Sequence, residues 1–360
     1  MMFVSGLVLI DAPHSALNMM GTDTNIAERN KVIVKKLKSG KDTYVYVSAQ
    51  AWRYWWRETL KDRFNWKLSP LEKVEGKSQV YTQANPIKYE DDDVFGYMKA
   101  LEGALTVTRI SPLKNSPLIS ILPTRNSLAS DFATASRHEG DPVPYETEFY
   151  STVLKGLFSL DLDSVGKFSL IDKAGFRNLI DFNSLSKETK KKIKKLKDLK
   201  SKWEEEFLKV AKEIGVEMKE NKWIMPREIR AKRAKETIQA LKYLYGGAKQ
   251  TLFFTDVRPK LVILGLFEGG VNPFTNLFYE DKGEIKFDKE GFIEGVKECA
   301  DILNPKKIFI GIDKAFARKW NLNLENLKDE DGEIEIICKN IGDVLDEVSK
   351  EIEKYYMSRM

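Results

Sequence analysis

A chain of 360 residues with 42% hydrophobic and 31% charged residues has the balance of a globular protein with a sizeable core, which argues against a disordered chain or a membrane protein. Two cysteines, Cys299 and Cys338, and two histidines argue against a disulfide framework and a zinc site, and they fit a reducing cytoplasm. Residues 187–202 hold nine lysines and two acidic residues, a local net charge of +7. The overall net charge is +5, so the rest of the chain has a net charge of −2. Global basicity is therefore no indication of nucleic-acid binding, and a lysine-rich run is typical of a solvated helix face.

The first quarter of the chain predicts strands followed by a helix. The apolar residues 3–10 predict a buried β-strand rather than a signal peptide, because no basic residue precedes them. Two strands are predicted around the turn at 39–42, and Ser48 is placed to cap a helix over 48–63. Residues 67–93 show no sustained period; we interpret them as an insertion of loops ending in a solvated acidic run at 90–93.

The remaining chain alternates short apolar runs with charged helices. Residues 123–148 are rich in Ser, Asp, Pro and Gly and predict a long loop, which is usually functional or mobile. Charged helices are predicted over 186–221 and 226–245, and a last helix over 343–355. The main elements in chain order are a strand (3–10), a helix (48–63), strands (103–110 and 251–265), a helix (288–303) and a strand (306–312). This βαββαβ order predicts an α+β, RRM-like (ferredoxin-like) sheet with large insertions.

The stretch WRYWWRETL, residues 52–60, combines three tryptophans with two arginines. Helical spacing places Gln50, Arg53 and Arg57 on one face and lets the tryptophans pack into the core. The two arginines fit an anion lying across the helix, as in single-stranded nucleic-acid binding, and equally fit two solvated side chains.

A glycine pair followed by Lys249 and Gln250 comes after the second charged helix. Paired glycines leave amide groups for a phosphate, although a plain helix end also explains them. No nucleophile arrangement accompanies the histidines, and Asp11, Asp23 and Asp131 are candidate acids without a recognisable pattern.

Six motifs in order resemble the DevR-type CRISPR-associated autoregulators of the Cas-seven family, the backbone subunits of type I Cascade complexes. They are LIDAPHSALNMMG, VYVSAQAWRYWWRETL, VFGYM, ISPLKNSPLISIL, FYSTVLKGLFSLDLDSVG and GGAKQTLFFTDVRPKLVIL, and the resemblance spans about residues 3–312. It implies an RRM-like palm, a helical insertion domain and a projecting hairpin called the thumb. It also implies that copies stack along CRISPR RNA, kink it with their thumbs, and display it for pairing with target DNA.

The resemblance implies a division of the chain and a set of RNA contacts. The expected parts are a discontinuous palm (1–66, 94–122 and 246–315), an insertion loop (67–93), the thumb (123–150), strands with the helical insertion domain (151–245), and a C-terminal extension (316–360). The implied RNA contacts are Asn18, Ser48, Gln50, Arg53, Arg57, Arg125, Arg137, His138, Gly246, Gly247, Lys249 and Gln250. In one departure, Lys249-Gln250 stands where the family pattern has an asparagine followed by histidine or arginine.

The expected function is a non-catalytic, cytoplasmic subunit without cofactor or membrane contact. Its expected partners are CRISPR RNA, further copies of itself, other Cascade subunits and, through the guide, target DNA. A metal-dependent ribonuclease using Asp11, Asp23 or Asp131 is one alternative. A transcriptional autoregulator is another, although no helix-turn-helix signal is present.

Overall fold

The structure is a computed structural model that describes residues 1–22, 30–73, 79–101, 106–137, 139–171, 176–180, 182, 185, 187–192, 196–219, 221–324 and 327–358. Within these residues, every helix is too short or too polar to cross a membrane.

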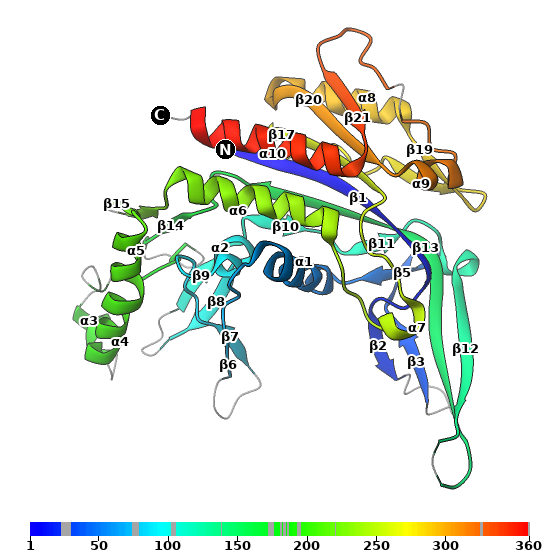
Figure 1. Cartoon of the computed structure of the whole chain (residues 1–360), viewed down its shortest axis with the longest axis horizontal. Coiled ribbons are helices and arrows are strands. Elements are labelled where there is room, and N and C mark those ends of the chain that lie inside the picture. Colours follow the sequence, from blue (N-terminus) through cyan, green and yellow to red (C-terminus); the bar gives the residue numbers. More distant parts are fainter. Residues whose placement is uncertain are drawn as a thin grey trace.

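One large sheet runs through the molecule, with strand β1 (Met2–Ser15) in its middle (Figure 1). β1 pairs antiparallel with β13 (Val143–Asp161) on one side and with β17 (Leu261–Glu268) on the other. Alternation along β1 sends Val4 and Val8 into one core cluster and Leu7 and Leu9 into another, because successive side chains point to opposite faces. Beyond these strands the sheet adds β20 (Leu303–Ile312) and β21 (Glu335–Lys339) past β17, and β11 (Leu118–Ser120), β5 (Asp42–Val47) and β4 (Lys36–Ser39) past β13.

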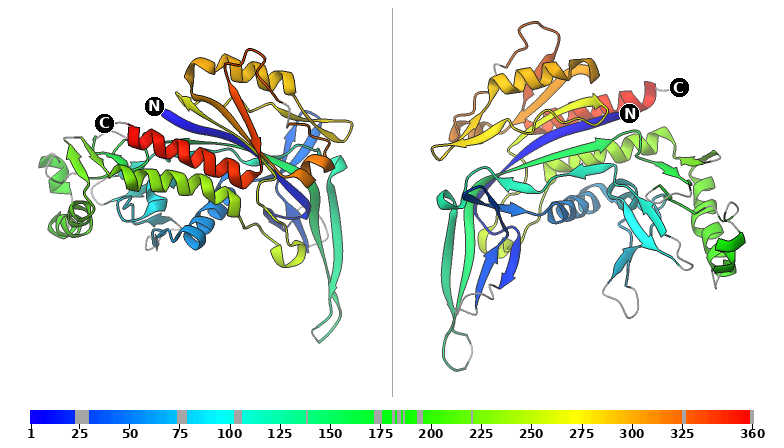
Figure 2. Two further views of the ribbon diagram at one scale, coloured as in Figure 1. Left: turned by 45° about the horizontal axis from the view of Figure 1, so that its top comes forward. Right: turned by 180° about the vertical axis from the view of Figure 1, so that it is seen from behind.

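Three helices cover the face of the sheet on which Val4 and Val8 lie: α1 (Ala49–Phe64), α6 (Arg227–Gln239) and α10 (Ile341–Ser358). The predicted start of α1 is confirmed, because the Ser48 side chain accepts a hydrogen bond from the Ala51 amide. The prediction that the tryptophans belong to the core is also confirmed, since Trp52 and Trp56 are fully buried. Helix α10 runs alongside α6 (Figure 2) and completes this layer.

Some of the elements predicted to make up the βαββαβ order are wrong. The strand predicted at 103–110 is β9 (Thr106–Arg109), which pairs with β8 (Tyr97–Ala100) in a separate small sheet, and β13 takes the place beside β1. The strand predicted from residue 251 begins only at Leu261, after the short helix α7 (Gln250–Phe253). Helix α8 (Lys289–Glu298) packs on the opposite face from α1, because Phe292 shares its cluster with Leu7 and Leu9.

The segment expected to be a long loop at 123–148 is a β-hairpin. Strand β12 (Leu128–Ala135) pairs with β13 from Leu128↔Tyr150 to Ala135↔Val143, and the hairpin projects from the body of the molecule (Figure 1). Short strands β2 (Met19–Thr22) and β3 (Lys31–Val34) lie beside its base, where Lys31 forms an ion pair with Glu146 at 2.7 Å. Most of β12 is exposed, so no buried face imposes the apolar alternation by which strands are recognised.

The helix predicted over 186–221 is several elements. It is divided into α3 (Lys187–Lys192), α4 (Leu196–Trp203), a π-helical turn (Glu204–Lys209) and α5 (Val210–Glu213), and it ends at Gly215 with φ +77°. Three short strands form a separate small sheet in the order β14 (Lys167–Ser169), β16 (Lys222–Ile224) and β15 (Glu217–Lys219). The remaining elements are β6 (Leu71–Lys73), β7 (Val80–Thr82), α2 (Glu90–Phe95), β10 (Leu113–Asn115), β18 (Phe278–Asp281), β19 (Glu284–Phe287) and α9 (Lys314–Lys319).

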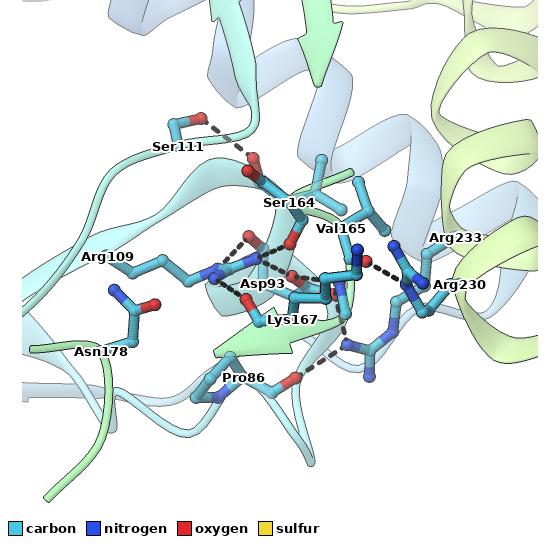
Figure 3. A network of polar contacts seen from close by, with 12 residues as sticks. Pro86, Asp93, Arg109, Ser111, Ser164, Val165, Lys167, Asn178, Arg230 and Arg233 are labelled. Atoms are coloured by element: carbon cyan, nitrogen blue, oxygen red, sulfur yellow. Dashed lines mark hydrogen bonds and ion pairs between the residues drawn. The ribbon is translucent and has the colours of Figure 1, made fainter. Parts of the chain in front are cut away.

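The acidic run at 90–93 is not a solvated loop, because it forms helix α2 with Asp91, Asp92 and Asp93 buried. The Asp93 carboxylate accepts hydrogen bonds from Arg109, from Arg233 Nη1 at 2.7 Å and from the Gly166 amide (Figure 3). Burial, with the neighbouring Asp92 charge, raises the pKa of Asp91 to about 6. The run is a structural junction that joins α2 to β9, α6 and the chain after β13.

Candidate nucleic-acid interface

Three segments far apart in the sequence meet near the base of the projecting hairpin: the chain after β1, the start of α1 and the glycine loop (residues 246–250). The Ala248 amide donates to the Leu17 carbonyl at 2.9 Å, which joins the glycine loop to the chain after β1. The Asn18 Oδ1 accepts from the Ser48 amide at 3.0 Å, which joins that chain to the first turn of α1. The structure therefore brings together six of the expected RNA contacts: Asn18, Ser48, Gly246, Gly247, Lys249 and Gln250.

The two glycines are required by backbone shape and by close packing. Gly246 has φ +143°, and a Cβ there would lie 2.4 Å from Trp55 Cδ1. Gly247 has φ +100°, and a Cβ there would lie 2.5 Å from Leu17 Cδ2. The helical chain ends earlier, at Tyr243, so a helix end does not account for the pair. Within the described residues neither glycine amide donates a hydrogen bond, so neither is used inside the protein.

Lys249 and Gln250 have different roles in this loop. Lys249 adopts a left-handed backbone conformation with φ +54° and supplies the positive charge. The Gln250 Nε2 donates to the Gly246 carbonyl and, at 3.2 Å, to the Thr255 carbonyl. Gln250 therefore closes the loop on itself, and its side-chain amide is already used inside the protein.

The expectation that Arg53 is an exposed residue is wrong. Its guanidinium donates to Leu113 O, Asn115 Oδ1, Phe95 O and Ser111 Oγ at 2.7 to 2.8 Å. These bonds use four of its five N–H donors. Burial, with the nearby Arg57 charge, lowers the pKa of Arg53 to about 10.

Arg57 is also only partly exposed, and its guanidinium lies 4.4 Å from the centre of the Phe95 ring. Burial lowers the pKa of Arg57, against the opposing effect of Asp91 and Asp92. Trp55 faces the glycine loop, and Arg53 lies about 200° around the helix from it, at 100° per residue. Both arginines are therefore turned away from the site, and Gln50, which is exposed in the first turn of α1, shares their face of the helix.

We expect Arg53→Ala to lower the free energy of unfolding by about 1–3 kcal/mol, because it leaves several acceptors without a charged donor. Arg53→Lys should also destabilise, since an ammonium group cannot reach four acceptors. Urea denaturation measures both changes against Gln50→Ala, for which a shift within about 0.5 kcal/mol is expected. Unchanged stability of Arg53→Ala would show that these four hydrogen bonds contribute little.

The three RNA contacts expected in the thumb do not lie together in the structure. Arg125 lies at the base of the hairpin, where it forms an ion pair with Asp42. Arg137 is exposed near the tip, and His138 lies outside the described residues. The hairpin does expose apolar side chains, with Phe132 70% and Tyr145 40% exposed.

The acids considered for a nuclease are scattered. The Asp11 carboxylate accepts from Lys319 Nζ at 2.8 Å, Asp131 is exposed on β12, and Asp23 lies outside the described residues. In the part of the chain that the structure describes, no group of three or more His, Cys, Asp or Glu side chains is arranged to hold a metal ion.

Sequence reasoning missed Trp55 and Leu17 as the walls that shape the glycine loop. The sequence predicts that Trp55 belongs to the core with its neighbours, and it is buried, but its ring also packs against Gly246. Pairing a tryptophan at position 55 with a glycine at 246 requires the folded chain, because nothing local to either residue indicates the other.

Comparison with known proteins gives a family and a fold. The family described as "CRISPR-associated negative auto-regulator DevR/Csa2" matches residues 6–285. No curated protein sequence matches the chain. A solved structure described as "CRISPR RNA-guided surveillance complex, pre-nicking" contains a similar chain, with a TM-score of 0.53, 12% identity, and coverage of 97% of this chain and 100% of that one. Another solved structure, described as "CRISPR RNA-guided surveillance complex", contains a chain with a TM-score of 0.49 and 12% identity. The match covers 97% of this chain and 99% of that one.

Proposed function

The chain belongs to the DevR/Csa2 family of CRISPR-associated proteins, and from this premise we propose that it is a non-catalytic backbone subunit that binds CRISPR RNA. The observation that carries the proposal is the glycine loop, whose two glycine amides donate to no group among the described residues and which lies, with Lys249, beside Asn18 and the start of α1. Backbone amides and a lysine bind phosphates without reading bases. A guide subunit needs this property, because the guide sequence varies.

We propose that the central sheet is an RRM-like palm. The antiparallel order β17–β1–β13–β11, with α1 and α6 packed on one face, supports this, because it is the order of a ferredoxin-like sheet. The proposed palm then includes α6 and the part of β13 after residue 150, which the expected boundaries placed with the insertion domain. The proposed thumb is the β12–β13 hairpin, and the helical insertion domain comprises α3 to α5 with the small sheet beside them.

In this proposal, copies of the chain line up along the guide RNA within a type I surveillance complex. Each copy holds a segment of backbone at its glycine loop, and its thumb separates that segment from the next. The bases stay free to pair with target DNA, and a separate recruited protein cuts the target. The fold shared with a chain of a surveillance complex supports this arrangement.

Lys249→Ala should weaken binding to unrelated single-stranded RNAs by a similar factor for each sequence. The slope of log affinity against log salt should become shallower by about 0.7, which is the contribution of one single-strand phosphate contact. Fluorescence anisotropy at several salt concentrations measures both quantities. Lys289→Ala, which removes an exposed lysine on α8 on the opposite face of the sheet, is the matched control and should change neither.

Two results would overturn the proposal. Cutting of RNA in magnesium that is abolished by Asp11→Ala, Asp23→Ala or Asp131→Ala would make the protein a nuclease. Tight binding to one duplex operator, with little affinity for single-stranded RNA, would make it a transcriptional autoregulator, in keeping with the words "negative auto-regulator" of the family description.

A further inference from the structure

We infer that the ring of Phe254 is a stacking platform for a base of the bound single strand, placed beside the phosphate-binding glycine loop. The inference rests on the proposed function and adds a residue that the expected contacts do not include. It assigns the segment from Gly246 to Thr255 two tasks, holding a phosphate at one end and a base at the other.

Phe254 is the most exposed large hydrophobic side chain of the described residues, at 92%. Its neighbour Phe253 points the other way and stacks on Phe149 of β13, with 5.5 Å between ring centres and 27° between planes. The pair therefore has one anchored ring and one presented ring. Core packing accounts for Phe253 and leaves Phe254 without a structural role.

The backbone conformation of Phe254 is a second sign that this exposed ring has a functional role. Its φ and ψ of +45° and +54° lie in the left-handed region, where glycine and asparagine are favoured and a bulky side chain is strained. The Phe254 amide donates to the Gln250 carbonyl at 2.8 Å, which fixes this conformation at the end of α7. A strained residue that buries nothing is characteristic of a functional position.

The loop also fixes the ring relative to the phosphate-binding end. Helix α7 is a single turn between Lys249 and Phe254, both left-handed, and the Gln250 side chain bonds to carbonyls on either side of that turn. In Figure 1 and in the right view of Figure 2, α7 lies beside β2 near the base of the thumb. The Ser15 and Thr255 hydroxyls, 2.8 Å apart, tie the far end of the segment to β1.

A cationic loop followed by a presented aromatic ring suits single-stranded nucleic acid, in which phosphates and bases alternate. Stacking tolerates any base, because every base has a π-face, so it preserves sequence-independent binding. Leu252, 60% exposed, lies on the same turn and leaves a protein contact as the competing explanation.

The test compares Phe254→Ala, Phe254→Leu and Phe254→Trp in binding to single-stranded RNA. Loss of one base–aromatic stack should weaken binding by about 5- to 150-fold for Phe254→Ala. Phe254→Leu should lose most of this affinity because it keeps apolar area without a π-face, whereas Phe254→Trp should retain it. The salt slope should stay unchanged, since no phosphate contact is removed. Tyr279→Ala, which removes another exposed ring on β18, is the control and should bind normally.

Two further measurements separate stacking from other causes. With an oligomer whose sugars carry no bases, wild type and Phe254→Ala should bind equally. Phe254→Gly, which suits the left-handed backbone, should melt at the wild-type temperature or above and still bind RNA weakly, which shows that unfolding is not the cause.

The inference fails if wild type binds RNA and Phe254→Ala binds it equally well. It also fails if Phe254→Ala reduces only the number of copies assembled on RNA, which would identify a protein contact. Failure of the wild type to bind single-stranded RNA would instead overturn the proposed function itself.

Discussion

Asp93→Asn is expected to lower the free energy of unfolding by about 3–5 kcal/mol, because it leaves two buried guanidinium groups without a counter-charge. The side chains of Asp93, Arg109 and Arg233 are 0%, 3% and 5% exposed. An asparagine keeps the size of the side chain and part of its hydrogen bonding, so the change isolates the charge. Denaturation by urea, followed by circular dichroism, measures the shift.

Asp331→Asn is the matched control, since Asp331 is 74% exposed and forms an ion pair with Lys297. Exposed pairs of this kind contribute about 0–1 kcal/mol. Equal shifts for the two variants would contradict the view that the buried network of Figure 3 holds α2 and α6 together.

Trp56→Ala should be similarly destabilising, at about 3–5 kcal/mol, because it removes a large, fully buried side chain. The indole stacks on Trp52 at 5.4 Å, lies nearly perpendicular to the ring of Phe158, and donates from Nε1 to the Thr237 carbonyl of α6 at 2.8 Å. Its loss leaves a cavity between α1 and α6 together with a buried carbonyl that has lost its donor. Thermal denaturation by calorimetry or circular dichroism measures the effect.

Tyr54→Ala on the same helix is the control, because Tyr54 is 59% exposed. A shift within about 0.5 kcal/mol is expected for it. If Trp56→Ala were as mild as Tyr54→Ala, the tryptophan-rich stretch would not be the core of the palm, and a surface role for its rings would have to be reconsidered.

The sequence predicts those features of the fold that depend on residues close to one another in the chain. Ser48 caps α1 because its hydroxyl reaches the amide three residues on, and this can be read from the sequence. Trp52 and Trp56 are buried because their spacing places them on one side of the helix. The turn between β4 and β5 follows from Ser39-Gly40-Lys41-Asp42 in the same way.

Features that depend on distant partners could not be predicted. Arg53 looked exposed because its four acceptors come from residues 95 to 115, which are remote in sequence. Asp93 looked solvated because Arg109 and Arg233 reach it from other elements. The choice of β13 rather than β9 as the neighbour of β1 likewise depends on pairing across the sheet.

In the candidate site, too, some features can be predicted from the sequence and others depend on distant residues. The glycine pair and Lys249 stood out in the sequence, but the tie from Ala248 to Leu17 and the wall formed by Trp55 appear only in the folded chain. The two arginines that first suggested nucleic-acid binding are turned away from this site, so binding is proposed for the loop instead.

The most direct test of the backbone-subunit proposal is the mass of the complexes that purified protein forms on single-stranded RNAs of graded length and unrelated sequence. The proposal predicts that the number of bound copies rises in equal steps with length, independently of sequence, and that the RNA stays intact. A fixed stoichiometry at every length, or degraded RNA, would contradict it.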